Sequence, residues 1–147
     1  MKFACRLLFA FCLVLGAGDI FTCAAQNCSC PKKPELEEAY ADSAVVFLGQ
    51  VENQEDSVLR PEFIEVRLAV QRKFKWMSEL ASSQSIVVYT PSEQGRCGYT
   101  FQNGFDYLVF AKGNPAYLRV DSCSRTNVIE NSQLDREKLQ RLIKPAK

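Results

Sequence analysis

The residues Cys28-Ser29-Cys30-Pro31 place two cysteines one residue apart, directly after an apolar leader. A secreted chain begins at such a point once its leader has been removed. We expect the remaining residues to form a scaffold that holds this short segment rigid, so that the backbone of the segment is the active part.

The first 27 residues have the layout of a secretory signal peptide. Met1-Lys2 gives a basic start, residues 3–18 are mostly apolar, and small residues follow at Ala24 and Ala25. The alternative is a membrane anchor, but the apolar run is too short to cross a bilayer and Arg6 interrupts it. We expect a signal peptide over residues 1–27, with its cut site after one of residues 25–27, and secretion of one extracellular domain over 28–147.

The charges of the chain do not point to nucleic acid as a partner. There are 18 Lys and Arg residues against 17 Asp and Glu residues, and loss of the leader leaves sixteen of each. A balanced chain lacks the basic excess that is typical of nucleic-acid binding. The run Arg72-Lys73-Phe74-Lys75 is interpreted as a solvated strand edge, with a polyanion site as the alternative. Beyond the leader, no segment approaches the roughly 20 apolar residues of a membrane span.

Four cysteines remain after the leader: Cys28, Cys30, Cys97 and Cys123. In an oxidising compartment they predict two disulfides, for which three pairings exist. A bridge between Cys28 and Cys30 would close a very tight ring, so we expect each of these two to pair with one of the distant cysteines. The alternative is a zinc site of four thiolates. Such a site usually has two CxxC pairs, whereas 26 residues separate Cys97 from Cys123.

The chain contains no histidine. This excludes catalysis by Ser-His-Asp or Cys-His groups, and it excludes metal sites built on imidazole. The sequence also has no Gly-rich phosphate-binding loop. We therefore expect neither an enzyme nor a cofactor of its own.

Alternating and β-branched residues predict five strands, with a helix near each end of the domain. The strands are expected at 44–51, 63–70, 85–90, 105–111 and 116–120, with a loop over 53–61 and the first helix at 34–41. The second helix should begin after Ser132, with Asp135 completing a capping box. Its apolar stripe, expected to pack on the strands, is Leu134, Leu139, Leu142 and Ile143. Five short antiparallel strands without a long unpaired edge predict a small closed barrel in a mainly β domain.

Several of these features occur together in one family. The CxC pair is followed by Cys97-Gly98-Tyr99, then by residues 107–113 (YLVFAKG), and then by Cys123. In this order and spacing they resemble the netrin-like module, and more closely the N-terminal domain of the tissue inhibitors of metalloproteinases. The resemblance covers nearly the whole chain after the leader. It implies an OB-like barrel with disulfides Cys28–Cys97 and Cys30–Cys123.

The resemblance also implies inhibition of extracellular zinc metalloproteinases, which we expect of a monomer. The first cysteine of the mature chain, here Cys28, would chelate the catalytic zinc of the protease through its α-amino group and its carbonyl oxygen. The zinc therefore belongs to the partner. Ser29 would point into the main specificity pocket. The implied protease contact comprises Cys28, Ser29, Cys30, Pro31, Gly95, Arg96 and Cys97.

The chain departs from the pattern of this family in three respects. It stops at Lys147 without the second, cysteine-rich domain, and no cysteine between Cys30 and Cys97 can form the third disulfide. Cleavage directly before Cys28 would follow Asn27, although a small residue is preferred there and a cut after Ala25 fits better. Retention of residues 26 and 27 would convert the amine into an amide and block chelation.

The alternative function is a netrin-like extracellular binding module without inhibitory activity. Such a module would dock to matrix, or to glycosaminoglycan through Arg67, Arg72, Lys73 and Lys75. The residue at the mature N-terminus discriminates between the two functions.

Overall fold

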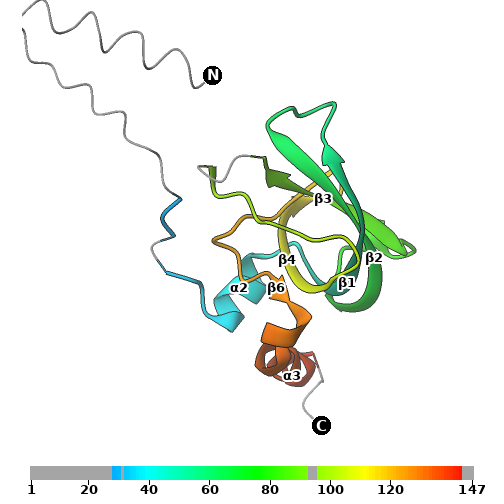
Figure 1. Cartoon of the computed structure of the whole chain (residues 1–147). Helices are drawn as coiled ribbons and strands as arrows, with labels where there is room; N and C mark the ends of the chain where they lie inside the picture. The colour runs from blue at the N-terminus through cyan, green and yellow to red at the C-terminus, as the bar shows by residue number, and fades with distance from the viewer. Residues whose placement is uncertain (1–27, 31, 93–95, 144–147) are drawn as a thin grey trace, which may run out of the picture.

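The computed structural model describes residues 28–30, 32–92 and 96–143. The predicted signal peptide over 1–27 lies outside the described residues, as do Pro31 and Gly95 of the implied contact. The described residues form a mainly β domain with two α-helices at its lower end in Figure 1. In this part of the chain, no helix is long and apolar enough to cross a membrane.

Five strands close into a barrel in the order β1-β2-β3-β5-β4, because β4 also pairs with β1. The small OB-like barrel that the sequence predicts is therefore confirmed. The prediction that all five strands are antiparallel is wrong at one pair, since β3 and β5 run parallel while the other pairs around the barrel are antiparallel. The strands of the described residues are β1 (Val45–Asp56), β2 (Phe63–Lys75), β3 (Ser85–Pro91), β4 (Asp106–Asn114), β5 (Tyr117–Arg119) and the short β6 (Asn127–Val128), which adds to β4.

The hairpin between β1 and β2 is longer than the sequence analysis predicts. Residues 53–61 are predicted to be a loop, but β1 continues to Asp56 and pairs Asn53 with Arg67 and Glu55 with Glu65. Polar residues suit this end of β1 because most of them are exposed to solvent. Backbone pairing with β2 therefore extends the strand in spite of the low strand propensity of Asn, Glu and Asp.

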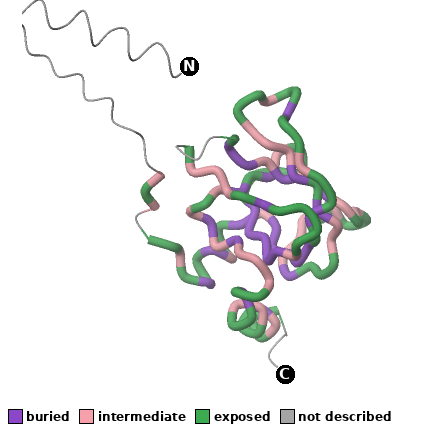
Figure 2. Tube along the Cα trace, in the orientation of Figure 1, coloured by how far each residue is buried: buried purple, intermediate pink, exposed green. Residues whose placement is uncertain are grey.

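Two hydrophobic clusters hold the domain together. The first fills the barrel, and the second lies between the barrel wall and the helices α2 (Leu36–Asp42) and α3 (Gln133–Leu142). β1 contributes to both, since Val45 and Phe47 belong to the first cluster and Val46 and Leu48 to the second. This burial on both faces explains why the start of β1 is a continuous apolar run. Figure 2 shows the buried residues gathered in the barrel and beside the helices.

The helix α2 has the inward face that the sequence predicts. Leu36 and Ala39 are buried, and Tyr40 packs against the second cluster. Lys75 Nζ donates to the Tyr40 carbonyl at 2.8 Å and to the Ala41 carbonyl at 2.9 Å. This ammonium lies at the negative end of the helix dipole and joins α2 to the end of β2.

The helix α3 forms where predicted, but of its predicted apolar stripe only Leu139 packs as expected, and the predicted capping box is wrong. Leu139 is buried, whereas Leu134, Leu142 and Ile143 are 74%, 49% and 38% exposed. A short 3-10 turn, Ile129–Asn131, precedes the helix, and the Ser132 hydroxyl donates back to the Ile129 carbonyl instead of capping α3. Asp135 binds Arg125 instead of reaching back to the start of the helix.

Candidate functional site

Two disulfides join residues 28–30 to two distant loops. Cys28 is bonded to Cys97 with the Cα atoms 5.0 Å apart, and Cys30 is bonded to Cys123 with the Cα atoms 5.3 Å apart. This is the pairing that the family resemblance implies. The sulfurs of Cys28, Cys97 and Cys123 all lie within 4.8 Å of one another, so the two bridges are adjacent. Sulfurs bonded in this way present no thiolate to a metal ion.

The loop before Cys123 supports both bridges. The Ser122 backbone N–H donates to the Cys97 carbonyl at 2.8 Å, and the Ser122 hydroxyl lies 3.3 Å from the Cys28 sulfur. The Cys123 N–H donates to Asp121 Oδ1 at 3.0 Å. Ser122 therefore contacts both Cys28 and Cys97, the two residues of the first disulfide.

The backbone of residues 28–30 is available to a partner. Ser29 is exposed, and Cys28 and Cys30 are half-buried. Among the described residues, no other group makes a hydrogen bond to the backbone of this segment. Backbone N–H and C=O groups need a hydrogen-bonding partner once they leave water. Among the described residues, the segment is therefore held through its side chains, by the two disulfides and by the contact of Cys28 with Ser122.

The loop that carries Cys97 is tied to the β1–β2 hairpin. Arg96 forms an ion pair with Glu62, and both side chains remain about half exposed at 51% and 63%. The Ser92 N–H donates to the Glu62 carbonyl at 2.9 Å. Cys97 has a φ of 62°, the left-handed backbone that most non-glycine residues avoid. Arg96 is thus a paired residue at the edge of the candidate contact surface.

Tyr99 anchors the other end of this loop in the barrel. Its backbone N–H donates to Thr90 Oγ1 at 2.7 Å. The centre of its ring lies 4.7 Å from the centre of the Phe101 ring and 6.0 Å from that of the Tyr107 ring. Burial, with a further contribution from Tyr107, raises the pKa of Tyr99 to about 12. The motif Cys97-Gly98-Tyr99 therefore joins a disulfide directly to the core.

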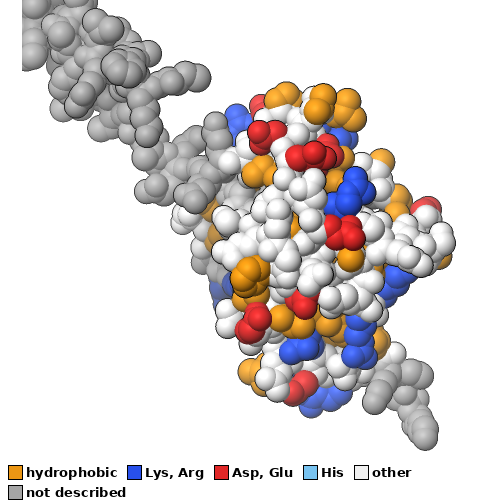
Figure 3. Space-filling view, turned by 45° about the vertical axis from the view of Figure 1, so that its right-hand side comes forward, with side chains coloured by type: hydrophobic (Ala, Val, Ile, Leu, Met, Phe, Trp, Pro, Cys, Tyr) orange, Lys and Arg blue, Asp and Glu red, His pale blue; other side chains and the backbone are white. Residues whose placement is uncertain are grey.

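The tip of the β1–β2 hairpin exposes two large apolar side chains. Val58 and Leu59 are 92% and 83% exposed, and hydrophobic side chains gather at the top of the molecule in Figure 3, where the hairpin ends. The Arg60 guanidinium lies 4.8 Å from the centre of the Tyr89 ring and 4.5 Å from that of Tyr117. These cation–π contacts connect the tip to β3 and β5.

The basic residues considered for glycosaminoglycan binding are largely engaged within the domain. The Arg72 guanidinium lies 5.2 Å from the centre of the Phe74 ring, and Lys73 donates to a carbonyl of the turn after β2. Lys75 binds the carbonyls at the end of α2. Arg67 is exposed on β2. Arg72 and Lys73 are exposed on β2 as well, so three of the four basic side chains face solvent.

Three residues of this region were not singled out from the sequence: Glu62, Ser122 and Arg125. Ser122 had a weak signal, since it is a polar residue directly beside a cysteine. Glu62 and Arg125 had none, because their partners Arg96 and Pro34 are far away in the sequence and only the barrel brings them together.

No protein-family model matches the chain, and no curated protein sequence matches it.

Proposed function

We propose that this chain is a secreted inhibitor of zinc metalloproteinases that acts through the main chain of Cys28. The observation that supports the proposal is the segment 28–30, in which Ser29 is exposed, two adjacent disulfides hold the cysteines, and the backbone has no hydrogen-bond partner among the described residues. The family resemblance supplies the partner: an extracellular protease whose catalytic zinc accepts the α-amino group and the carbonyl oxygen of Cys28.

The chemistry of such a complex follows from the open coordination position of a catalytic zinc. Three protein ligands hold the metal, and water occupies the fourth position. An amine and a carbonyl oxygen on one residue can take that position and displace the nucleophilic water. An α-amino group has a pKa of about 7.7–8.0, so a useful fraction of it is neutral and able to bind metal at physiological pH.

The two disulfides would contribute affinity by ordering the segment before it binds. A flexible segment loses conformational entropy on binding, and a pre-ordered one loses less. In this proposal the Ser29 side chain enters the specificity pocket, Cys30 and Pro31 extend the contact, and Gly95, Arg96 and Cys97 form its second part. Pro31 and Gly95 belong to it by resemblance alone, since both lie outside the described residues.

The decisive test compares two proteins with the same disulfides and different N-termini. One begins at Cys28, and its matched control retains residues 26 and 27, which turn the Cys28 amine into an amide. Hydrolysis of a fluorogenic peptide by a zinc metalloproteinase is measured against the concentration of each protein. We expect tight inhibition by the first and a loss of at least about a hundredfold in affinity for the second, because a metal ligand is removed. Equal inhibition by the two proteins would exclude chelation by the amine.

The exposed hairpin tip favours a second function, that of a non-inhibitory extracellular binding module. Val58 and Leu59 would then be the contact that a matrix partner covers, since adjacent exposed apolar side chains often mark an interaction site. Replacement of both by serine should abolish matrix binding in this case. Under the inhibitor proposal, the chain beginning at Cys28 inhibits a protease, which a docking module does not do.

A further inference from the structure

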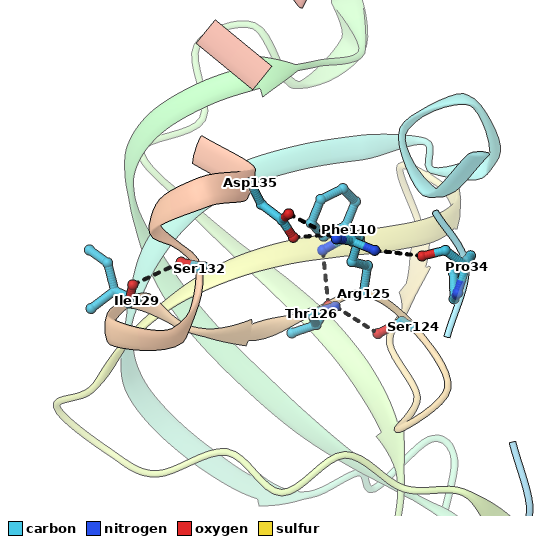
Figure 4. A network of polar contacts seen from close by, with 8 residues as sticks. All are labelled: Pro34, Phe110, Ser124, Arg125, Thr126, Ile129, Ser132 and Asp135. Atoms are coloured by element: carbon cyan, nitrogen blue, oxygen red, sulfur yellow. Dashed lines mark hydrogen bonds and ion pairs between the residues drawn. The ribbon is translucent and has the colours of Figure 1, made fainter. Parts of the chain in front are cut away.

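The segment after Cys30 has a third attachment to the domain, in addition to the two disulfides. The Pro34 carbonyl accepts a hydrogen bond from Arg125 Nη1 at 2.7 Å, as Figure 4 shows. Between Cys30 and Pro34, Lys32 and Lys33 are exposed and no backbone hydrogen bond to a described residue is found. The direction in which the chain leaves Cys30 therefore depends on where Pro34 is held.

Arg125 is itself fixed by the start of α3. Its Nε donates to Asp135 Oδ2 at 2.7 Å and its Nη2 donates to Asp135 Oδ1 at 2.9 Å, a two-pronged contact with the carboxylate. The two side chains are only 22% and 17% exposed. The hydrogen bond to Asp135 raises the pKa of Arg125, whereas partial burial opposes the rise. The Arg125 guanidinium thus bridges the Asp135 carboxylate of α3 and the Pro34 carbonyl.

The backbone that carries Arg125 is also anchored on the barrel. Thr126 Oγ1 accepts a hydrogen bond from the Phe110 N–H of β4 at 3.0 Å, and Ser124 Oγ accepts one from the Thr126 N–H at 3.3 Å. Two residues before Arg125, Cys123 holds Cys30. The stretch 123–125 therefore binds the N-terminal segment at two points, covalently at Cys30 and by a hydrogen bond at Pro34.

We propose that Arg125, supported by Asp135, is a positioning residue that sets the orientation of residues 28–34 for protease binding. The disulfides fix where Cys28 and Cys30 lie, and the Arg125–Pro34 bond fixes the direction of the main chain beyond them. The consequence for inhibition rests on the proposed function. The consequence for the order of the segment does not, since it follows from the contacts within this chain.

Arg125→Lys is the most informative variant, because lysine keeps the charge but lacks the planar fork. A single ammonium cannot reproduce both the paired contact with Asp135 and the bond to Pro34. Asp135→Asn is the second variant, in which Arg125 keeps its own charge and loses its support. Matched controls are Arg141→Lys and Glu137→Gln, both at exposed positions of α3, the helix that carries Asp135.

The first readout is the backbone order of the segment without any protease. We expect the NMR order parameters of the Lys32 and Lys33 amides to be about 0.85 in the wild type and to fall below about 0.6 in Arg125→Lys. Asp135→Asn should give a smaller fall, and the two controls should give none. Unchanged order parameters in both Arg125→Lys and Asp135→Asn would overturn the proposal, even if their melting temperatures fell.

The second readout is the dissociation constant for a zinc metalloproteinase, measured with chains that begin at Cys28 and well below all melting temperatures. Loss of the charged hydrogen bond to Pro34 should weaken binding at least about tenfold in Arg125→Lys, with no change in the controls. A wild type that inhibits, with an equally inhibitory and equally ordered Arg125→Lys, would refute the role of Arg125. A wild type that does not inhibit would refute the proposed function, and the order parameters would still decide whether Arg125 orients the segment.

Discussion

Ser29 is the side chain that the site exposes between its two half-buried cysteines. If it enters the specificity pocket of a protease, its small size leaves most of a deep pocket unfilled. Ser29→Leu should therefore tighten binding to deep-pocket metalloproteinases about tenfold or more, through burial of the added apolar carbons, and should weaken binding to shallow-pocket enzymes.

Inhibition constants for one enzyme of each kind measure this effect, with Ser29→Ala as the variant that adds no volume. The same change of affinity for both enzymes would show that residue 29 does not enter the pocket.

The raised pKa of Tyr99 leads us to expect a lower free energy of unfolding at alkaline pH. Burial raises this pKa from 10.0 to about 12, so the unfolded chain releases the hydroxyl proton at a lower pH than the folded domain does. The stabilising effect of the raised pKa is complete below pH 10 and is lost as the pH rises towards 12. Urea unfolding at a series of pH values should show this fall, and Tyr99→Phe should make it shallower. An identical pH dependence in the two proteins would contradict the assignment to Tyr99.

Among the elements, the turn between β4 and β5 depends on a glycine that has no room for a side chain. Gly113 has a φ of +119°, and a Cβ at this position would lie 2.1 Å from the Tyr117 carbonyl oxygen. Gly104 also has a positive φ, of +81°, but a Cβ added there would meet nothing within 4 Å beyond its chain neighbours. Comparison of alanine variants at the two glycines therefore distinguishes the cost of a steric clash from the cost of a left-handed backbone.

Gly113→Ala should lower the free energy of unfolding by at least about 3 kcal/mol, because the neighbouring antiparallel strand β5 must move. Gly104→Ala should cost only about 1–2 kcal/mol, the ordinary penalty of a left-handed backbone. Chemical denaturation of both variants measures the difference. Equal losses would mean that the β4–β5 turn relaxes without disturbing the barrel.

The sequence predicts single elements better than it predicts their partners. Alternation in β2 and the apolar runs of β1 and β4 locate these strands, because side-chain burial follows strand geometry. Periodicity does not say which strands pair, so the parallel β3–β5 contact was not foreseen. The exposed Leu134 shows the same limit, since an apolar spacing on α3 does not determine which residues meet the barrel. The Arg125–Pro34 contact joins residues 91 positions apart and has no local signal.

For the whole molecule, the two disulfides should supply a large share of the net stability. They connect residues 69 and 93 positions apart in the sequence. In the chain-entropy model each bridge of this length contributes about 4–5 kcal/mol. A domain of this size has a net stability of about 5–15 kcal/mol, so loss of both bridges should unfold it.

Urea denaturation of two double variants, Cys30→Ser/Cys123→Ser and Cys28→Ser/Cys97→Ser, measures the contribution of each disulfide to the free energy of unfolding separately. We expect each double variant to fold with a lower midpoint and the reduced wild type to be unfolded. A reduced wild type with an unchanged midpoint would show that the two hydrophobic clusters suffice without covalent links.

Inhibition by chelation depends most directly on the first residue of the mature chain, because only a free α-amino group on Cys28 can bind zinc. Intact mass and terminal sequencing of the secreted protein measure it. We predict a chain that begins at Cys28 and contains two disulfides. A chain that begins at Gln26 or Asn27 would contradict chelation by Cys28 and would leave the docking function in its place.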